Sequence, residues 1–154
     1  MIAEFALTKR ADGAGSVVVV TDNWARDMKK LKNPKGHEKT LALMLRLAEV
    51  KLDKGYDQGW IKYPLHYTGG VAELRSKGVR SYGKPVGPID NRTLVVFEAA
   101  EEKRREDEAD QALTARAVEV GDAIGKRWEA LRATEPADDK VVHISAHKRD
   151  KGKR

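Results

Sequence analysis

Between residues 60 and 100 the sequence loses its helical periodicity and breaks into short extended segments, and this change restricts the fold more than any other feature. The segments are WIKYPLHY (60–67), GVAELR (70–75), VRSYGKPVG (79–87) and RTLVVFEAA (92–100), and the turn residues TGG, SKG and GPIDN separate them. Extended runs with such short, Gly-containing connections favour antiparallel pairing between neighbours in the chain. Proline cannot donate to a strand ladder, so Pro64 and Pro85 belong at an edge, a strand end or a bulge. We therefore predict an antiparallel meander.

The segment before the meander predicts one strand and two helices. The β-branched run SVVVVT (16–21) follows a Gly-containing turn and indicates a buried strand. From Thr21 onward, helix-capping residues precede a short amphipathic pattern that stops near residues 33–36. A second apolar stripe then runs to Leu52, and Gly55 fits the position just past a helix end. Two helices joined this closely form a helical hairpin.

The chain becomes helical again after the meander. Apolar residues recur every three or four positions from Leu113 to Leu131, which predicts a long C-terminal helix. The rest of the chain is polar and ends in a basic cluster, although VVHIS (141–145) has the composition of an edge strand. Helices segregated from a small antiparallel sheet indicate the α+β class. We expect a single domain over residues 1–133 and a basic, flexible tail over residues 134–154.

Composition narrows the classes of partner and chemistry. The formal net charge of +6 over 154 residues favours a polyanionic partner, and nucleic acid is the leading candidate. The absence of cysteine excludes disulfides and thiolate metal sites. His143 and His147 lie four residues apart without evident further ligands, so we expect no metal and no cofactor. No apolar run approaches the length of a membrane span, and we expect a soluble cytoplasmic protein that does not engage a membrane.

Arg75 and Arg80 lie on consecutive predicted strands, on either side of the SKG turn, and are the first candidates for a site. Cleavage of RNA by the adjacent 2′-hydroxyl needs a base, a proton donor and cations around the phosphorus. A guanidinium stays charged and can bridge two phosphate oxygens, so the two arginines suit the cation role if both face one side of the sheet. The alternative is ordinary ion pairing with Glu73 or Glu98 across the strands.

Other polar side chains of the meander would complete such a site. His66, Tyr67 and Tyr82 are candidates for proton transfer, joined by His143 and His147 only if the tail folds back. A single histidine without an orienting partner is more often a surface residue. The predicted nucleic-acid-binding residues are Lys62, His66, Arg75, Lys77, Arg80, Lys84 and Arg104.

Three pieces of the chain carry a resemblance to a known group of proteins. They are VVVVTDNWARDMKKL, WIKYPLHYTGGVAELRSKGVRSYGKPVG and RTLVVFEAAEEKRREDEADQAL, and together they span residues 16 to 125. In this order they resemble the RelE/ParE superfamily of toxins from bacterial and phage toxin–antitoxin systems, including the HigB-like relatives. AELR followed by Arg80 is the most specific part of the match.

The resemblance implies a toxin of a type II toxin–antitoxin system, an endoribonuclease that cleaves mRNA without a metal, either on the ribosome or free. It implies a cognate antitoxin protein as partner, with a homodimer left open. It also implies catalytic roles for Arg75, Arg80, Tyr82 and Lys103.

Two departures from the family pattern leave other functions open. The paired-lysine motif of many members corresponds here to EEKRRED, where Lys103 and Arg104 stand among acidic residues. No residue clearly matches the C-terminal tyrosine or histidine that some ribonuclease members use. The alternatives are a ParE-like inhibitor of DNA gyrase, and a phage-derived, non-catalytic protein that binds nucleic acid or a host protein on the same fold.

Overall fold

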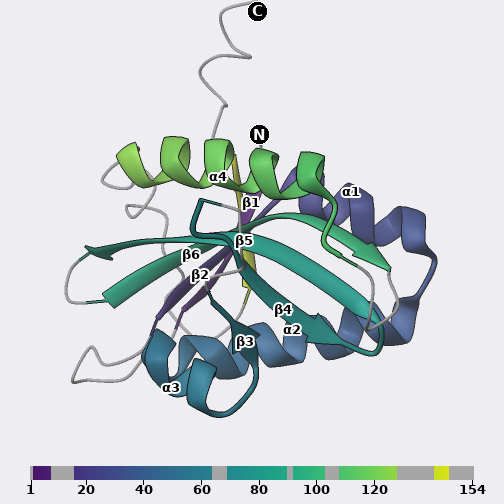
Figure 1. Cartoon of the computed structure of the whole chain (residues 1–154), viewed down its shortest axis with the longest axis horizontal. Helices are drawn as coiled ribbons and strands as arrows, with labels where there is room; N and C mark the ends of the chain where they lie inside the picture. Colours follow the sequence, from purple (N-terminus) through teal and green to yellow (C-terminus); the bar gives the residue numbers. More distant parts are fainter. Residues whose placement is uncertain are drawn as a thin grey trace, which may run out of the picture.

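The computed structural model describes the backbone of residues 2–7, 16–63, 69–89, 92–102, 108–127 and 141–145, and the side chains within 16–63, 69–87, 93–102 and 108–127. The described residues form one mixed β-sheet with helices on both of its faces (Figure 1). The α+β class predicted from the sequence is confirmed.

The central part of the sheet has the strand order β3-β4-β5-β6-β2. These strands are β3 (Ile61–Lys62), β4 (Ala72–Ser76), β5 (Val79–Ile89), β6 (Arg92–Glu102) and β2 (Val17–Thr21). Consecutive strands from β3 to β6 pair antiparallel, which confirms the predicted meander. The expectation of a wholly antiparallel sheet is wrong, because β2 pairs parallel to β6. A parallel pair needs a long crossover, and here the crossover contains the helices and the strands between β2 and β6.

Two further strands extend the sheet beyond β2. They are β1 (Ile2–Leu7) and β7 (Val141–Ser145), both antiparallel to their neighbours, in the order β2-β1-β7. Strand β1 was not predicted from its sequence, whereas β7 coincides with the VVHIS segment. Residues 141–145 therefore belong to the sheet, although they lie within the region predicted as a tail.

Four helices are described: α1 (Asp22–Leu31), α2 (Pro34–Ala48), α3 (Leu52–Asp57) and α4 (Gln111–Lys126). Thr21 caps α1 by accepting the backbone N–H of Trp24, as the capping pattern predicted.

The second helix, α2, ends earlier than expected. Ser16 donates its hydroxyl to the Val50 carbonyl and its backbone N–H to the Ala48 carbonyl, which satisfies groups that a continuing helix would need. The predicted extension of the last helix to residue 131 lies outside the described residues.

The two faces of the sheet bury different helices. On one face, Ala72 and Leu74 of β4 pack in the main core with Trp24 of α1 and Met44 of α2. On the other face, the alternate residues of the strands pack against α4, and Tyr82 shares a cluster with Ala117. Figure 1 shows α4 on the side of the sheet opposite to α2 and α3. Helix α4 packs mainly on β5 and β6, so the β3 and β4 side of this face lies beyond its main contacts.

Candidate functional site

The β4–β5 hairpin places the two candidate arginines side by side. Its turn is made by Lys77 and Gly78, whose φ angles of 52° and 78° are the left-handed values that a two-residue hairpin turn requires. In the resulting register, Arg75 lies opposite Arg80 and Glu73 lies opposite Tyr82. Residues opposite each other in an antiparallel pair project to the same face. All four side chains therefore belong to the face that α4 partly covers.

Both arginines bind the carboxylate of Glu73. Arg75 Nη2 lies 2.9 Å and Arg80 Nε 3.2 Å from the same oxygen, Glu73 Oε1. The exposed fraction of the side chain is 37% for Arg75, 2% for Arg80 and 4% for Glu73. The structure therefore shows the ion pairing considered as the alternative, and it corrects the idea of a two-arginine phosphate clamp, because Arg80 has almost no accessible surface. Arg75 alone retains an exposed guanidinium.

Tyr82 is equally shielded. Its side chain is buried, and its hydroxyl donates to Glu101 Oε2 at 2.5 Å. Burial, and then the hydrogen bond to Glu101, raise the pKa of Tyr82 well above its usual value. The same Glu101 oxygen accepts the backbone N–H of Asp110, the N-cap of α4. Tyr82 therefore stays protonated and links β5 to the start of α4, which does not suit the proton-transfer role predicted for it.

The predicted lysines divide into structural and accessible groups. Lys84 Nζ donates to the Gly69 carbonyl at 2.9 Å, and the lysine stem fills the space where a Cβ on Gly121 would stand, so Lys84 supports α4. Lys62 and Lys77 are exposed. The predicted site residues His66, Lys103 and Arg104 lie outside the described residues.

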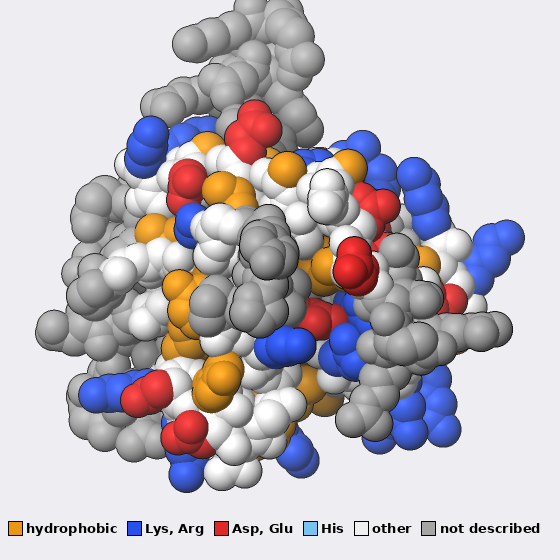
Figure 2. Space-filling model, viewed as in Figure 1, with side chains coloured by type: hydrophobic (Ala, Val, Ile, Leu, Met, Phe, Trp, Pro, Cys, Tyr) orange, Lys and Arg blue, Asp and Glu red, His pale blue; other side chains and the backbone are white. Residues whose placement is uncertain are grey.

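A pocket of about 540 Å³ lies where α3, the following turn, β3 and β4 meet. The residues that line it are Tyr56, Gly59, Trp60, Ile61, Lys62, Glu73 and Arg75. Basic and acidic side chains lie close together over the β4 part of the face shown in Figure 2. The volume falls within the range of pockets that hold small organic groups. Two sequence-predicted residues, Lys62 and Arg75, thus meet in one concave site.

The aromatic walls of this pocket were not predicted as site residues. Tyr56 is 52% exposed and is the large apolar side chain that stands out among the described residues. Trp60 is half-buried and follows Gly59 directly. An exposed tyrosine and a half-buried tryptophan beside two cations offer faces for base stacking and charges for phosphate. The signal available in the sequence was YDQGWIK, in which two aromatic residues flank a turn before Lys62.

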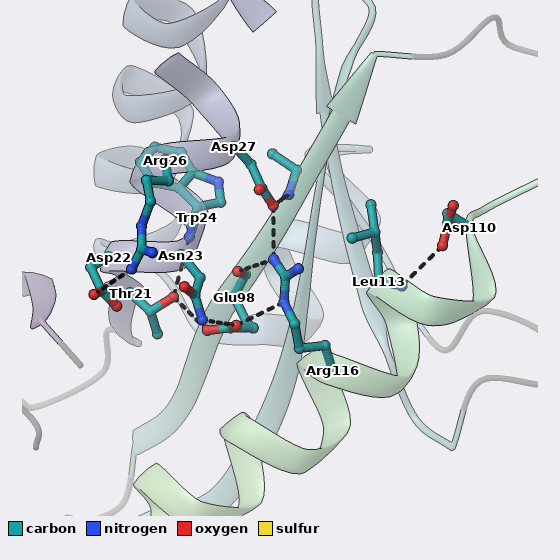
Figure 3. A network of polar contacts seen from close by, with 11 residues as sticks. Thr21, Asp22, Asn23, Trp24, Arg26, Asp27, Glu98, Asp110, Leu113 and Arg116 are labelled. Atoms are coloured by element: carbon teal, nitrogen blue, oxygen red, sulfur yellow. Dashed lines mark hydrogen bonds and ion pairs between the residues drawn. The ribbon is translucent and has the colours of Figure 1, made fainter. Parts of the chain in front are cut away.

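A second polar cluster surrounds Glu98 in β6 (Figure 3). The β5–β6 register shifts so that Tyr82 pairs with Ala99 and Gly83 with Phe97, which leaves Glu98 as the extra residue of a β-bulge. Its carboxylate accepts hydrogen bonds from Thr21 Oγ1 at 2.5 Å, from Asn23 Nδ2 at 2.7 Å and from Arg116 Nε at 2.9 Å.

Arg116 connects this cluster to α1. Its Nη2 atom donates to Asp27 Oδ2 at 2.8 Å, and the same Asp27 oxygen accepts the backbone N–H of Ala100 at 3.1 Å. Burial raises the pKa of Glu98 above its usual value, although the hydrogen bonds from Thr21, Asn23 and Arg116 oppose the shift. We interpret the cluster as structural, because its donors come from β2, α1 and α4 and join these elements to β6.

Comparisons with protein-family models, with curated proteins and with solved structures found no match. Among the described residues, no helix has both the length and the apolar composition needed to cross a membrane. The same residues contain no group of three or more histidine or acidic side chains arranged to hold a metal ion.

The shared carboxylate predicts unequal roles for the two arginines in stability. Replacing Arg80 by alanine should lower the free energy of unfolding by about 3 kcal/mol, because the change removes one partner of a buried ion pair. Arg75→Ala should lower it by less than about 1 kcal/mol, since the exposed arginine is screened by solvent. Urea denaturation measures both, with the exposed turn variant Lys77→Ala as a control. Equal losses for Arg75→Ala and Arg80→Ala would contradict the arrangement.

The raised pKa of Glu98 predicts a specific dependence of stability on pH. A carboxyl group whose pKa is higher in the folded state than in the unfolded state contributes stability at low pH and loses it as pH rises above the usual value of 4.5. Glu98→Gln removes this titration and keeps a similar shape. The variant should therefore gain stability relative to the wild type between about pH 4 and pH 7, measured by denaturation across that range. A difference that is constant with pH would refute the assignment.

Proposed function

We propose that this chain is an RNA-binding protein of the RelE/ParE toxin type, which holds a single-stranded RNA segment in the pocket between α3, β3 and β4. The observation that carries the proposal is the meeting of Tyr56, Trp60, Lys62 and Arg75 around one pocket. Stacking on aromatic side chains combined with a positively charged wall is the usual way in which proteins hold single-stranded nucleic acid. The net charge of +6 supports a polyanionic ligand.

The order of elements supports the toxin part of the proposal. After β1, the chain runs through β2, the helices α1 to α3, the antiparallel meander β3 to β6 and helix α4, an order similar to the one that the RelE/ParE resemblance implies. Helices α1 and α2 contribute residues to the main core together with the strands of the meander. A toxin of this type would act in the cytoplasm on mRNA or the ribosome and would be silenced by a cognate antitoxin protein.

The geometry favours RNA binding over catalysis by Arg80 and Tyr82. Arg80 and Tyr82 are buried, which leaves Arg75 and Lys62 as the accessible cations of the pocket. Metal-free RNA cleavage is the second candidate function, and Glu73 is the observation that favours it. Only 4% of the Glu73 side chain is exposed, but this residue lines the pocket beside Arg75. A carboxylate and a guanidinium are the types needed to accept a 2′-hydroxyl proton and to stabilise the phosphate.

The pocket hypothesis predicts that aromatic and cationic substitutions weaken RNA binding without unfolding the protein. Tyr56→Ala should weaken binding of a fluorescein-labelled oligouridine by roughly 5- to 100-fold, because one stacked base contributes about 1–3 kcal/mol. Arg75→Ala should weaken binding about tenfold through loss of a charge-assisted phosphate contact. Fluorescence anisotropy measures the affinities, and binding should quench tryptophan fluorescence in the wild type but much less in Trp60→Phe.

Lys54→Ala is the matched control, because Lys54 is an exposed cation of α3 that does not line the pocket. Its affinity should remain within about twofold of the wild type, since the charge lost is exposed to solvent and screened, and every residue that lines the pocket is kept. Cleavage of the same RNA, with and without ribosomes, and inhibition of growth on expression separate binding from toxin activity. Unchanged affinity in both Tyr56→Ala and Arg75→Ala would rule out the pocket as the RNA site, and inhibition of gyrase supercoiling would favour the ParE-like alternative.

A further inference from the structure

A second basic surface lies at the corner between α1 and α2, away from the pocket. Its members, which we call the lysine corner, are Lys29, Lys30, Lys32, Lys35 and Lys39, and all five are exposed. Within residues 29–39 the acidic residue is Glu38 alone. Figure 2 shows Lys and Arg side chains projecting along the edge of the molecule on the side of α1. The corner therefore concentrates positive charge on an exposed surface.

The fold does not require these charges. Among the described residues, none of the five lysine side chains takes part in a hydrogen bond or an ion pair. The dipole of α1 accounts for a modest benefit from Lys29 and Lys30, which lie in its last turn. Lys35 lies in the first turn of α2, where a positive charge opposes the helix dipole. That turn contains no acidic residue of its own, and the nearby carboxylate is that of Glu102, which accepts a hydrogen bond from the N-cap Asn33. The stability of the two helices therefore does not explain why the corner contains this many lysines.

The backbone conformation of Lys32 is also unfavourable for a lysine. It ends α1 with φ 51°, in the left-handed region, where glycine or asparagine is the usual residue. A lysine at this position sacrifices some stability that glycine would provide. The side chain is exposed and makes no hydrogen bond or ion pair with another described residue that would compensate for this cost.

We infer that the lysine corner is a second RNA-contacting surface, which binds the phosphate backbone of double-helical RNA. The inference rests on the RNA-binding part of the proposed function. Lysine is a compact charge on a flexible stem and can follow phosphates whose positions vary. The five residues include no aromatic or amide group that would read a base, so contact with the backbone fits them better than recognition of sequence. The pocket would hold an unpaired segment while the corner contacts a neighbouring helix.

The test compares two triple variants that lose the same charge. The corner variant combines Lys29→Gln, Lys30→Gln and Lys35→Gln. The control variant combines Lys51→Gln, Lys54→Gln and Lys126→Gln, and so removes three exposed lysines elsewhere. Each lost phosphate contact should reduce the slope of log affinity against log salt by about 0.7–0.9. The corner variant should therefore lose about 2 units of slope with a double-stranded RNA probe, and the control variant should lose much less. Equal losses in the two variants would overturn the inference.

Further arms separate this inference from the pocket hypothesis. Lys32→Gly should keep or raise the melting temperature and weaken binding to double-stranded RNA, whereas Tyr56→Ala should weaken binding to oligouridine and leave the salt slope with duplex RNA unchanged. A corner variant with wild-type binding to duplex RNA defeats the inference and leaves the pocket standing. If the corner variant loses more affinity for anionic phosphatidylserine vesicles than for duplex RNA, the surface would be assigned to a membrane instead.

Discussion

The buried carboxylate of Glu98 is the interaction on which the rest of the arrangement depends. It lies at a bulge in β6 and accepts hydrogen bonds from β2, α1 and α4. A buried carboxylate is tolerated only when such donors surround it. Its three partners join β2, α1 and α4 to β6, and Arg116 is the partner that ties α4 to the sheet. The position of α4 in turn decides which side chains of the sheet face reach solvent. Tyr82 lies beneath it, whereas Arg75 lies beyond it at the pocket.

Local patterns were sufficient to predict the hairpin but not the partners of its charged residues. The SKG turn fixed the register, so the placement of Arg75 and Arg80 on one face followed from the sequence. Their exposure did not follow, because it depends on tertiary packing, in which Arg80 is buried beside Glu73 and Arg75 is not. The parallel pairing of β2 with β6 also depends on contacts between distant segments. The early end of α2 has the same origin, since the residue that satisfies its last carbonyl groups is Ser16.

The two basic surfaces differ in ways that suggest different tasks. The pocket combines Lys62 and Arg75 with aromatic walls, and it can order a base as well as a phosphate. The five side chains of the lysine corner carry charge without aromatic surface, and they lie at the end of α1 and the start of α2. The phosphate contacts of the lysine corner would supply affinity and position, and the base contacts of the pocket would supply selectivity. Together they describe a protein that would engage RNA at the junction of an unpaired segment and a helix.

The central claim is that RNA bases enter the pocket at Tyr56 and Trp60. Photo-crosslinking of the protein to a single-stranded RNA containing 4-thiouridine, followed by identification of the crosslinked peptide, tests this claim most directly. We predict crosslinks within residues 56–62, because a base held in the pocket would contact Tyr56 and Trp60. Crosslinks confined to other parts of the chain, while residues 56–62 remain unmodified, would contradict it.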